Sequence, residues 1–283
     1  MKARVSYNET VGAPDPLKLD NLDQLNDNGG SNVFLTSVDD VTQDPSWLTG
    51  AKPDGNGKTG GSPSCVVITN DHGNGMVDVF YLYFYSYNLG IKVFGKNRGN
   101  HVGDWWSVLL SCCWWILTFY REHVMIRFQD EKPAALWYSQ HSSGQAFTYN
   151  AVKKQGIRPL AYSAVGTHAA YPTAGKQDHM DNCDKGTLWD PSLNAYYISF
   201  DRGTQSFSAY DDLVPTQWLD FTGHWGDQRY PDSDERQGEM FGIGATARFT
   251  DGPTGPRDKQ LDRTQVCPER DSLACVVHSV LES

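Results

Sequence analysis

Residues 65 to 90 carry the clearest hydrophobic pattern in the chain. Two apolar and aromatic runs, "CVVITND" and "MVDVFYLYFYSYNLG", flank the polar residues "HGNG". Asparagine followed by glycine favours the tight turns that join antiparallel strands. In the second run the side chains alternate between two faces, and both faces are mainly apolar or aromatic. The pattern therefore predicts a β-hairpin whose second strand lies in the centre of a two-layer sandwich.

Further short apolar runs follow along the chain, separated by Gly, Pro, Asn and Asp. They read "SNVFLTS", "EHVMIRFQ", "AALWYSQHS", "AFTYNAV", "RPLAYSAV", "AYYISFD" and "SFSAYDD". Runs of this length and composition predict strands, and we find no long amphipathic helical pattern. "DDVTQDPSWL" predicts one capped helical turn, with Asp39 or Asp40 as its N-cap. We expect an all-β fold, a single antiparallel β-sandwich-like domain with long irregular loops and few short helices.

The same pattern sets the expected organisation of the chain. Residues 1–32 contain the breakers "GAPDP" and "NDNGG" and predict a loop-rich segment. Residues 33–268 are expected to form the single β-rich domain. Residues 269–283 are expected to form a C-terminal tail, with a short helix between 270 and 283.

One apolar run, "WWSVLLSCCWWILTFY" at residues 105–120, does not fit its polar surroundings. It is too short for a membrane span, which needs about 20 apolar residues. It is also too long for a typical strand of about 5–6 residues. Removing residues 106–121 leaves "GNHVGDWEHVMIRFQ", in which a turn leads directly into an alternating strand. We therefore interpret residues 106–121 as a translated intron and expect a bulging, weakly packed excursion.

The joined sequence makes a further prediction about the two faces of this strand. Trp105, His123, Met125 and Arg127 would share one face, and Glu122, Val124, Ile126 and Phe128 the other. Asp104 and Glu122 are expected to lie close together at the base of the excursion.

The excess of acidic residues limits the classes of molecule that the chain is expected to bind. Asp and Glu number 34 against 24 Lys and Arg, a formal net charge of −10. Because nucleic acid is bound mainly through Lys and Arg, and no cluster of them occurs, we exclude it as a partner. We expect no transmembrane anchor, and the N-terminal residues lack the apolar core of a signal peptide. The cysteines show no C-x-x-C spacing that would predict zinc, so disulfide pairing among Cys65, Cys183, Cys267 and Cys275, or free thiols, stays open.

Several His, Asp and Glu residues could carry chemistry. Removal of residues 106–121 brings His101, Asp104, Glu122 and His123 together, and the turns "SQHSSG" and "GTHAAYP" hold His141 and His168. His with Asp or Glu serves both general acid–base catalysis and divalent-metal binding. We take these six residues as catalytic candidates, and His101, Asp104 and His168 as candidate ligands of a divalent metal. Asp78, His179, Asp184 and Asp190 are further polar positions of interest.

A structural role for these residues is the alternative. Buried carboxylates and imidazoles often bind loop backbone or pair with arginine, and Arg127, Arg158 and Arg229 are available as partners. No nucleophile elbow, phosphate-binding loop, dinucleotide-binding motif or H-E-x-x-H motif occurs. "GTLWDP" favours a turn at Asp190, with Trp189 packed beneath it.

A set of motifs in fixed order carries a resemblance from about residue 11 to residue 268. These are "NHVGDW" with "EHVMIRF", "WYSQHSSGQAFTY", "RPLAYSAVGTHAAYP", "GTLWDP", "WGDQRYPDSDERQ" and "GPTGPRDKQL". With residues 106–121 set aside, the chain resembles the vacuolar protein sorting-associated protein 62 family of fungi and plants. The resemblance implies a role in vacuolar sorting and a secretory, vacuolar or extracellular location, but no catalytic residues. It also implies that this chain is truncated at its N-terminus.

Three hypotheses for the function follow. The first is a non-enzymatic protein of vacuolar trafficking with protein partners. The second is a secreted or vacuolar metal-assisted hydrolase, or another small-molecule enzyme, that uses the His/Asp/Glu cluster. The third is a carbohydrate- or small-molecule-binding module that uses the Tyr and Trp faces.

Overall fold

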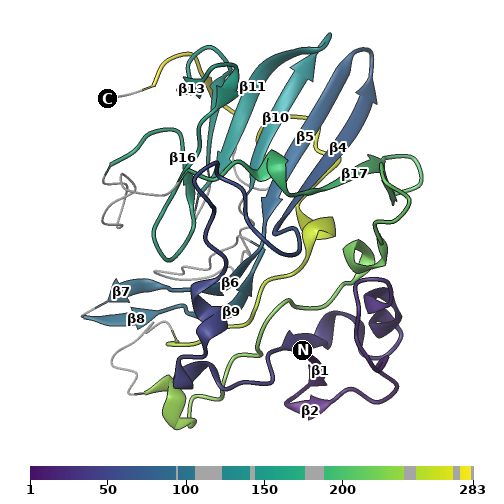
Figure 1. The fold of residues 1–283 in the computed structure, drawn as a ribbon, viewed down its shortest axis with the longest axis vertical. Coiled ribbons are helices and arrows are strands. Elements are labelled where there is room, and N and C mark those ends of the chain that lie inside the picture. The colour runs from purple at the N-terminus through teal and green to yellow at the C-terminus, as the bar shows by residue number, and fades with distance from the viewer. Residues whose placement is uncertain are drawn as a thin grey trace.

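The computed structural model describes residues 1–93, 95–105, 123–140, 144–175, 188–238, 247–269 and 275–281. Its main feature is an eight-stranded sheet with the order β18-β17-β4-β5-β10-β11-β12-β19, of which β4, β5, β10 and β11 are the long arrows in the upper half of Figure 1. The strands are β4 (Cys65–Gly73), β5 (Met76–Tyr83), β10 (Val124–Gln129), β11 (Lys132–Ser139), β12 (Gly144–Thr148), β17 (Tyr196–Asp201), β18 (Ser206–Ala209) and β19 (Val277–His278). The all-β fold class is confirmed.

The predicted hairpin forms the centre of this sheet. β4 and β5 pair antiparallel, and β10 pairs with the other edge of β5. Asn74 and Gly75 at the turn both have positive φ, 52° and 75°, as an Asn-Gly turn between twisted strands requires. β5 alternates between two cores, because Phe80 and Leu82 pack on one face and Tyr81 and Tyr83 on the other.

The two predicted faces after the apolar run are also found. Met125 lies in the same core cluster as Trp105 and Phe80, whereas Val124 and Ile126 pack on the opposite face of the sheet. These assignments follow from the strand period of two, which fixes the face of every side chain once the register is set.

Two pairs in the sheet differ from the antiparallel expectation. β17 runs parallel to β4, and β19 runs parallel to β12. Each pair joins segments far apart in the sequence, where no short turn enforces an antiparallel direction. β10, β11 and β12 do pair antiparallel with one another in sequence order, as expected.

Small sheets and 3-10 turns complete the fold. The short strands are β1 (Lys2–Val5), β2 (Asn8–Glu9), β3 (Phe34–Thr36), β6 (Tyr85–Asn88), β7 (Ile91–Val93), β8 (Lys96–Arg98), β9 (His101–Asp104), β13 (Lys154–Gln155), β14 (Arg158–Pro159), β15 (Tyr162–Ser163) and β16 (Ala170–Tyr171). The 3-10 helices are η1 (Leu22–Asn26), η2 (Gly30–Asn32), η3 (Val41–Gln43), η4 (Ser46–Thr49), η5 (Pro191–Leu193), η6 (Gln217–Asp220), η7 (Glu235–Gln237) and η8 (Pro256–Asp258). η3 is the predicted capped turn, because the Asp40 side chain accepts from the Thr42 amide at 2.9 Å.

The larger core lies between one face of the sheet and the irregular segments. Trp105 stacks on Trp218 at 5.4 Å between ring centroids, and Trp225 meets Trp105 edge-on at 5.3 Å. Paired aromatic rings of this kind add to the area that they bury. They fix the segments around residues 218 and 225 against the end of β9, and so position the site described below.

The described part of the C-terminal tail, residues 275–281, contains a short strand, and residues 270–274, where a helix was also expected, lie outside the described residues. Val277 and His278 form β19, and their parallel pairing with β12 satisfies backbone groups at an edge of the sheet. The predicted excursion at residues 106–121 lies outside the described residues. Every helix in the described ranges is short, and none has the length and hydropathy of a membrane span.

Candidate functional site

Asp104 and His168 are in contact although 64 residues separate them in the sequence. Nδ1 of His168 lies 3.0 Å from Oδ2 of Asp104, whose side chain is fully buried, while the His168 side chain is 15% exposed. The ring of Tyr85 stacks on the imidazole, with 3.7 Å between centroids and 7° between planes. The structure thus brings together two of the three residues expected at a metal site.

Backbone geometry positions both members of this pair. The register of β6 and β9 places Tyr85 directly opposite Asp104. Gly103 has φ 65° and lies against the Trp225 carbonyl, where a Cβ would collide. His168, in the turn between β15 and β16, has φ 64°. A positive φ is uncommon for a residue other than glycine, and such strained conformations concentrate at functional sites.

The hydrogen bond decides which nitrogen of His168 is available for chemistry. An ionised Asp104 can only accept, so Nδ1 carries the ring proton and Nε2 keeps the lone pair. An imidazole oriented in this way can take a proton or ligate a metal through Nε2. The third candidate ligand, His101, is buried, and its Nδ1 lies 2.8 Å from the Gly103 carbonyl oxygen. Within the described ranges, no three His, Cys, Asp or Glu residues are grouped closely enough to hold a metal. The metal stays a prediction.

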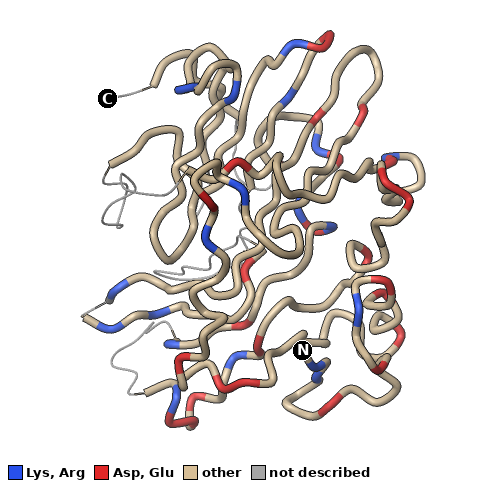
Figure 2. Tube along the Cα trace, viewed as in Figure 1, with Lys and Arg blue, Asp and Glu red and all other residues tan. Residues whose placement is uncertain are grey.

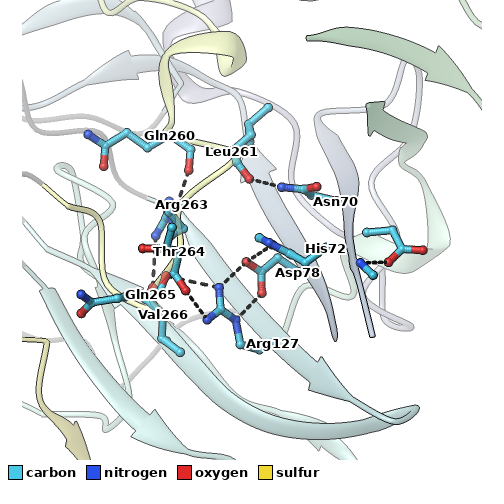
Figure 3. Close-up of polar contacts among 12 residues, drawn as sticks. Asn70, His72, Asp78, Arg127, Gln260, Leu261, Arg263, Thr264, Gln265 and Val266 are labelled. Carbon is cyan, nitrogen blue, oxygen red and sulfur yellow. Dashed lines mark hydrogen bonds and ion pairs between the residues drawn. The ribbon is translucent and has the colours of Figure 1, made fainter. Parts of the chain in front are cut away.

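Asp78 lies in a different place, on the sheet face shown in Figure 3. Arg127 donates from Nε to Oδ1 at 2.8 Å and from Nη2 to Oδ2 at 2.7 Å. His72, at a register shift of β4, places Nε2 2.9 Å from the same Oδ2. Arg127 also donates to the carbonyls of Thr264 and Gln265. Asp78 therefore has the structural role that the sequence left open, in which the carboxylate pairs with arginine.

His123, another catalytic candidate, contacts Arg263. Its Nε2 lies 2.6 Å from Nη2 of Arg263, which also donates to the Lys259 carbonyl at 2.8 Å. Lys259 in turn donates to the Trp105 carbonyl at 2.7 Å. These bonds hold the segment 259–267 against the sheet, and a disulfide from Cys267 to Cys275 follows it.

The other residues that the sequence singled out are a turn at Asp190, the cysteine Cys65 and several positions outside the described ranges. Asp190 caps η5 by accepting from the Ser192 amide, forms an ion pair with Arg158, and is preceded by Trp189, which packs on Tyr83. These contacts match the expected structural turn. Cys65 is a buried free thiol. Glu122, His141, His179, Cys183 and Asp184 lie outside the described residues.

A cavity of about 460 Å³ lies beside the N-terminal sheet, and sequence reasoning assigned it no role. We call it the Asp227 cavity. Asp and Glu are frequent in the lower half of Figure 2, where this sheet lies. The lining residues are Arg4, Tyr7, Thr36, Ser37, Val38, Asp39, Asp40, Asp227, Gln228, Tyr230, Pro231, Asp234 and Arg236. The dense polar motif "WGDQRYPDSDERQ" was the available signal, because it supplies six of these thirteen residues.

Two curated proteins of Saccharomyces cerevisiae are similar to the chain. Vacuolar protein sorting-associated protein 62 is 34% identical over 262 residues, which are 83% of this chain and 52% of that protein. TDA6, named as a candidate vacuolar protein sorting-associated protein, is 38% identical over 267 residues, 84% of this chain and 53% of that protein. The chain belongs to the vacuolar protein sorting-associated protein 62 family. It spans about half the length of these relatives.

Two other comparisons gave no match to this protein 62 homologue. No protein-family model matches the chain, and no solved structure matches it. No related structure therefore shows the Asp104–His168 pair or the Asp227 cavity, and both are seen in the structure of this chain alone.

Proposed function

We propose that the chain acts in the sorting of proteins to the vacuole. The similarity to protein 62 and TDA6 over 83% and 84% of this chain carries the proposal. The chain spans about half of each relative, and we assign the role to the region that they share.

A region swap tests this role. The matching half of the yeast protein 62 is replaced by this chain, with and without residues 106–121, in cells that lack the endogenous protein. We expect at least one swap to reduce the secreted fraction of a vacuolar protein to the level found in wild-type cells. Secretion that stays at the level of the deletion strain in both swaps, with normal protein abundance, contradicts the proposal.

One observation favours general acid–base catalysis as a second function. The hydrogen bond from His168 to Asp104 orients an imidazole whose Nε2 can accept a proton. The purified chain is assayed on ester, phosphoester and glycoside substrates beside His168→Gln and Asp104→Asn. We expect an activity that each substitution lowers about 10²–10⁴-fold, whereas His278→Gln leaves it unchanged. Activity that survives both substitutions, or none on any substrate, excludes this function.

A further inference from the structure

Residues 8–10, Asn-Glu-Thr, form the one Asn-x-Ser/Thr acceptor sequence for N-linked glycosylation in the chain. The residue between Asn8 and Thr10 is not proline, as this acceptor sequence requires. A motif of three residues also occurs by chance, so a modification site needs support from the fold. The surroundings of Asn8 and the state of the Thr10 hydroxyl both give that support.

Asn8 lies in an exposed position on an edge strand. The order β2-β1-β3 places β2 at one edge of the N-terminal sheet, and Figure 1 shows it at the periphery of the molecule. The side chains on either side of Asn8 are held by contacts, because the Tyr7 hydroxyl donates to the Arg229 carbonyl and Glu9 accepts from Lys2. The side chain of Asn8 itself is directed into solvent. A bulky, solvated glycan can therefore leave the surface here without displacing a structural contact.

The Thr10 hydroxyl has no hydrogen-bonding role in the described structure. Its Oγ1 is buried and has no hydrogen-bond partner among the described residues. The Thr10 amide donates to the Ala3 carbonyl at 2.9 Å, a bond that any residue except proline could make. A buried hydroxyl without a partner destabilises the folded state, so a valine of similar shape would suit this position better. The acceptor sequence, in contrast, requires a hydroxyl here, because only Ser or Thr completes it.

The disulfide between Cys267 and Cys275 is an independent observation about the compartment. Disulfides form and persist in oxidising environments such as the lumen of the endoplasmic reticulum, and they are rare in the cytosol. N-linked glycans are attached in that same lumen. The disulfide therefore indicates that the acceptor sequence meets the enzyme that uses it.

We propose that Asn8 is N-glycosylated. The co-reactant is an oligosaccharide linked through its anomeric carbon to a lipid diphosphate. Nδ2 of Asn8 forms a bond to that carbon and loses one proton, while the bond from the carbon to the diphosphate oxygen breaks and the oxygen keeps the electron pair. The modification is separate from the Asp104–His168 pair and from the Asp227 cavity, so it stands whether or not either of them binds or acts on a ligand.

Production of the full chain in yeast behind a cleavable secretion signal tests the proposal. We expect endoglycosidase H, which removes N-linked glycans of the high-mannose type, to increase the mobility of the chain in a denaturing gel. Peptide mapping of the treated chain should find the remaining N-acetylglucosamine on Asn8. Cell extract and medium are analysed together, and only chains with a cleaved signal are counted, so poor secretion does not affect the result.

Matched variants separate the acceptor sequence from its neighbours. Asn8→Gln and Thr10→Val each destroy the acceptor sequence, and we expect both to lose the mobility change. Thr10→Ser keeps a hydroxyl at this position and should keep the glycan. Asn32→Gln, at an exposed asparagine outside any acceptor sequence, should also keep it.

Thermal melting distinguishes loss of the acceptor sequence from damage to the fold. Wild type and Thr10→Val are compared after endoglycosidase H treatment. We expect the melting temperature of Thr10→Val to be the same or higher, because valine removes a buried hydroxyl that has no partner. The proposal is overturned if Asn8 is unmodified in chains with a cleaved signal, or if Asn8→Gln keeps the mobility change. A lower melting temperature in Thr10→Val would contradict the argument from the Thr10 hydroxyl.

Discussion

Arg127 and Asp78 face each other across β10 and β5 and form a two-pronged ion pair around a fully buried carboxylate. His72 and the carbonyls of Thr264 and Gln265 complete the network, which therefore links three parts of the chain. Removal of one partner from a buried pair leaves an uncompensated charge, and the cost is about 3–5 kcal/mol.

We expect Arg127→Met to lower the free energy of unfolding by about 3–5 kcal/mol, measured by urea denaturation. The double variant Asp78→Leu with Arg127→Leu should lose much less, because neither charge is left alone. Equal losses in the single and double variants would show that the ion pair itself contributes little.

Asp227 should give the stability a pH dependence of known sign. Burial raises its pKa above the ordinary value of 3.8, so the folded state holds this proton more tightly than the unfolded chain. The free energy of unfolding must then fall as pH rises from 3.8 to the raised pKa. Asp227→Asn should lack this fall, so urea denaturation from pH 3.5 to 7 should show the two curves diverging. Parallel curves would show that Asp227 has an unperturbed pKa.

The disulfide between Cys267 and Cys275 should hold the C-terminal segment that follows residues 259–267. It joins cysteines eight residues apart, and a loop of this length predicts a loss of about 2–3 kcal/mol in Cys267→Ser with Cys275→Ser. Peptide mapping without reduction should recover the two cysteines in one linked species.

Cys65 is buried and should react with iodoacetamide only in urea. A Cys65 that is alkylated under native conditions would contradict its placement in the core.

The contact of Asp104 with His168 should set the tautomer of the imidazole. We expect nitrogen NMR at neutral or higher pH to find the proton of neutral His168 on Nδ1, because the carboxylate accepts from that atom. Asp104→Ala should remove this preference. The tautomer of the control residue His278 should be the same in the wild type and in this variant. A proton found mainly on Nε2 in the wild type would contradict the contact.

The interpretation of residues 106–121 as a translated intron stays a prediction. We expect transcript sequencing to recover messages that join the codon of Trp105 directly to that of Glu122. Met125 already shares a core with Trp105, as the joined sequence requires. Transcripts that all retain the sixteen codons would rule out an intron.

Local signals in the sequence were enough for much of the fold. The Asn74-Gly75 turn, the strand period and the Asp40 cap each depend on a few neighbouring residues, and each is found as expected. The parallel pairs β17·β4 and β12·β19 could not be predicted in this way, because their partners are far apart in sequence. Val277 and His278 form a strand for the same reason, since they pair with an edge that their own sequence does not encode.

The same distinction between local signals and long-range contacts applies to the candidate sites. The sequence alone determined the all-β class, the family and the presence of His and Asp in polar turns, since these depend on composition, period and motif. Only the tertiary structure decided which residues meet. It placed Asp104 against His168, Asp78 against Arg127 and His123 against Arg263, and it formed a cavity that Arg4 and Asp227 line. Hydrogen bonds and burial act over a few ångströms, and the chain brings residues 4 and 227 within that range only when it folds.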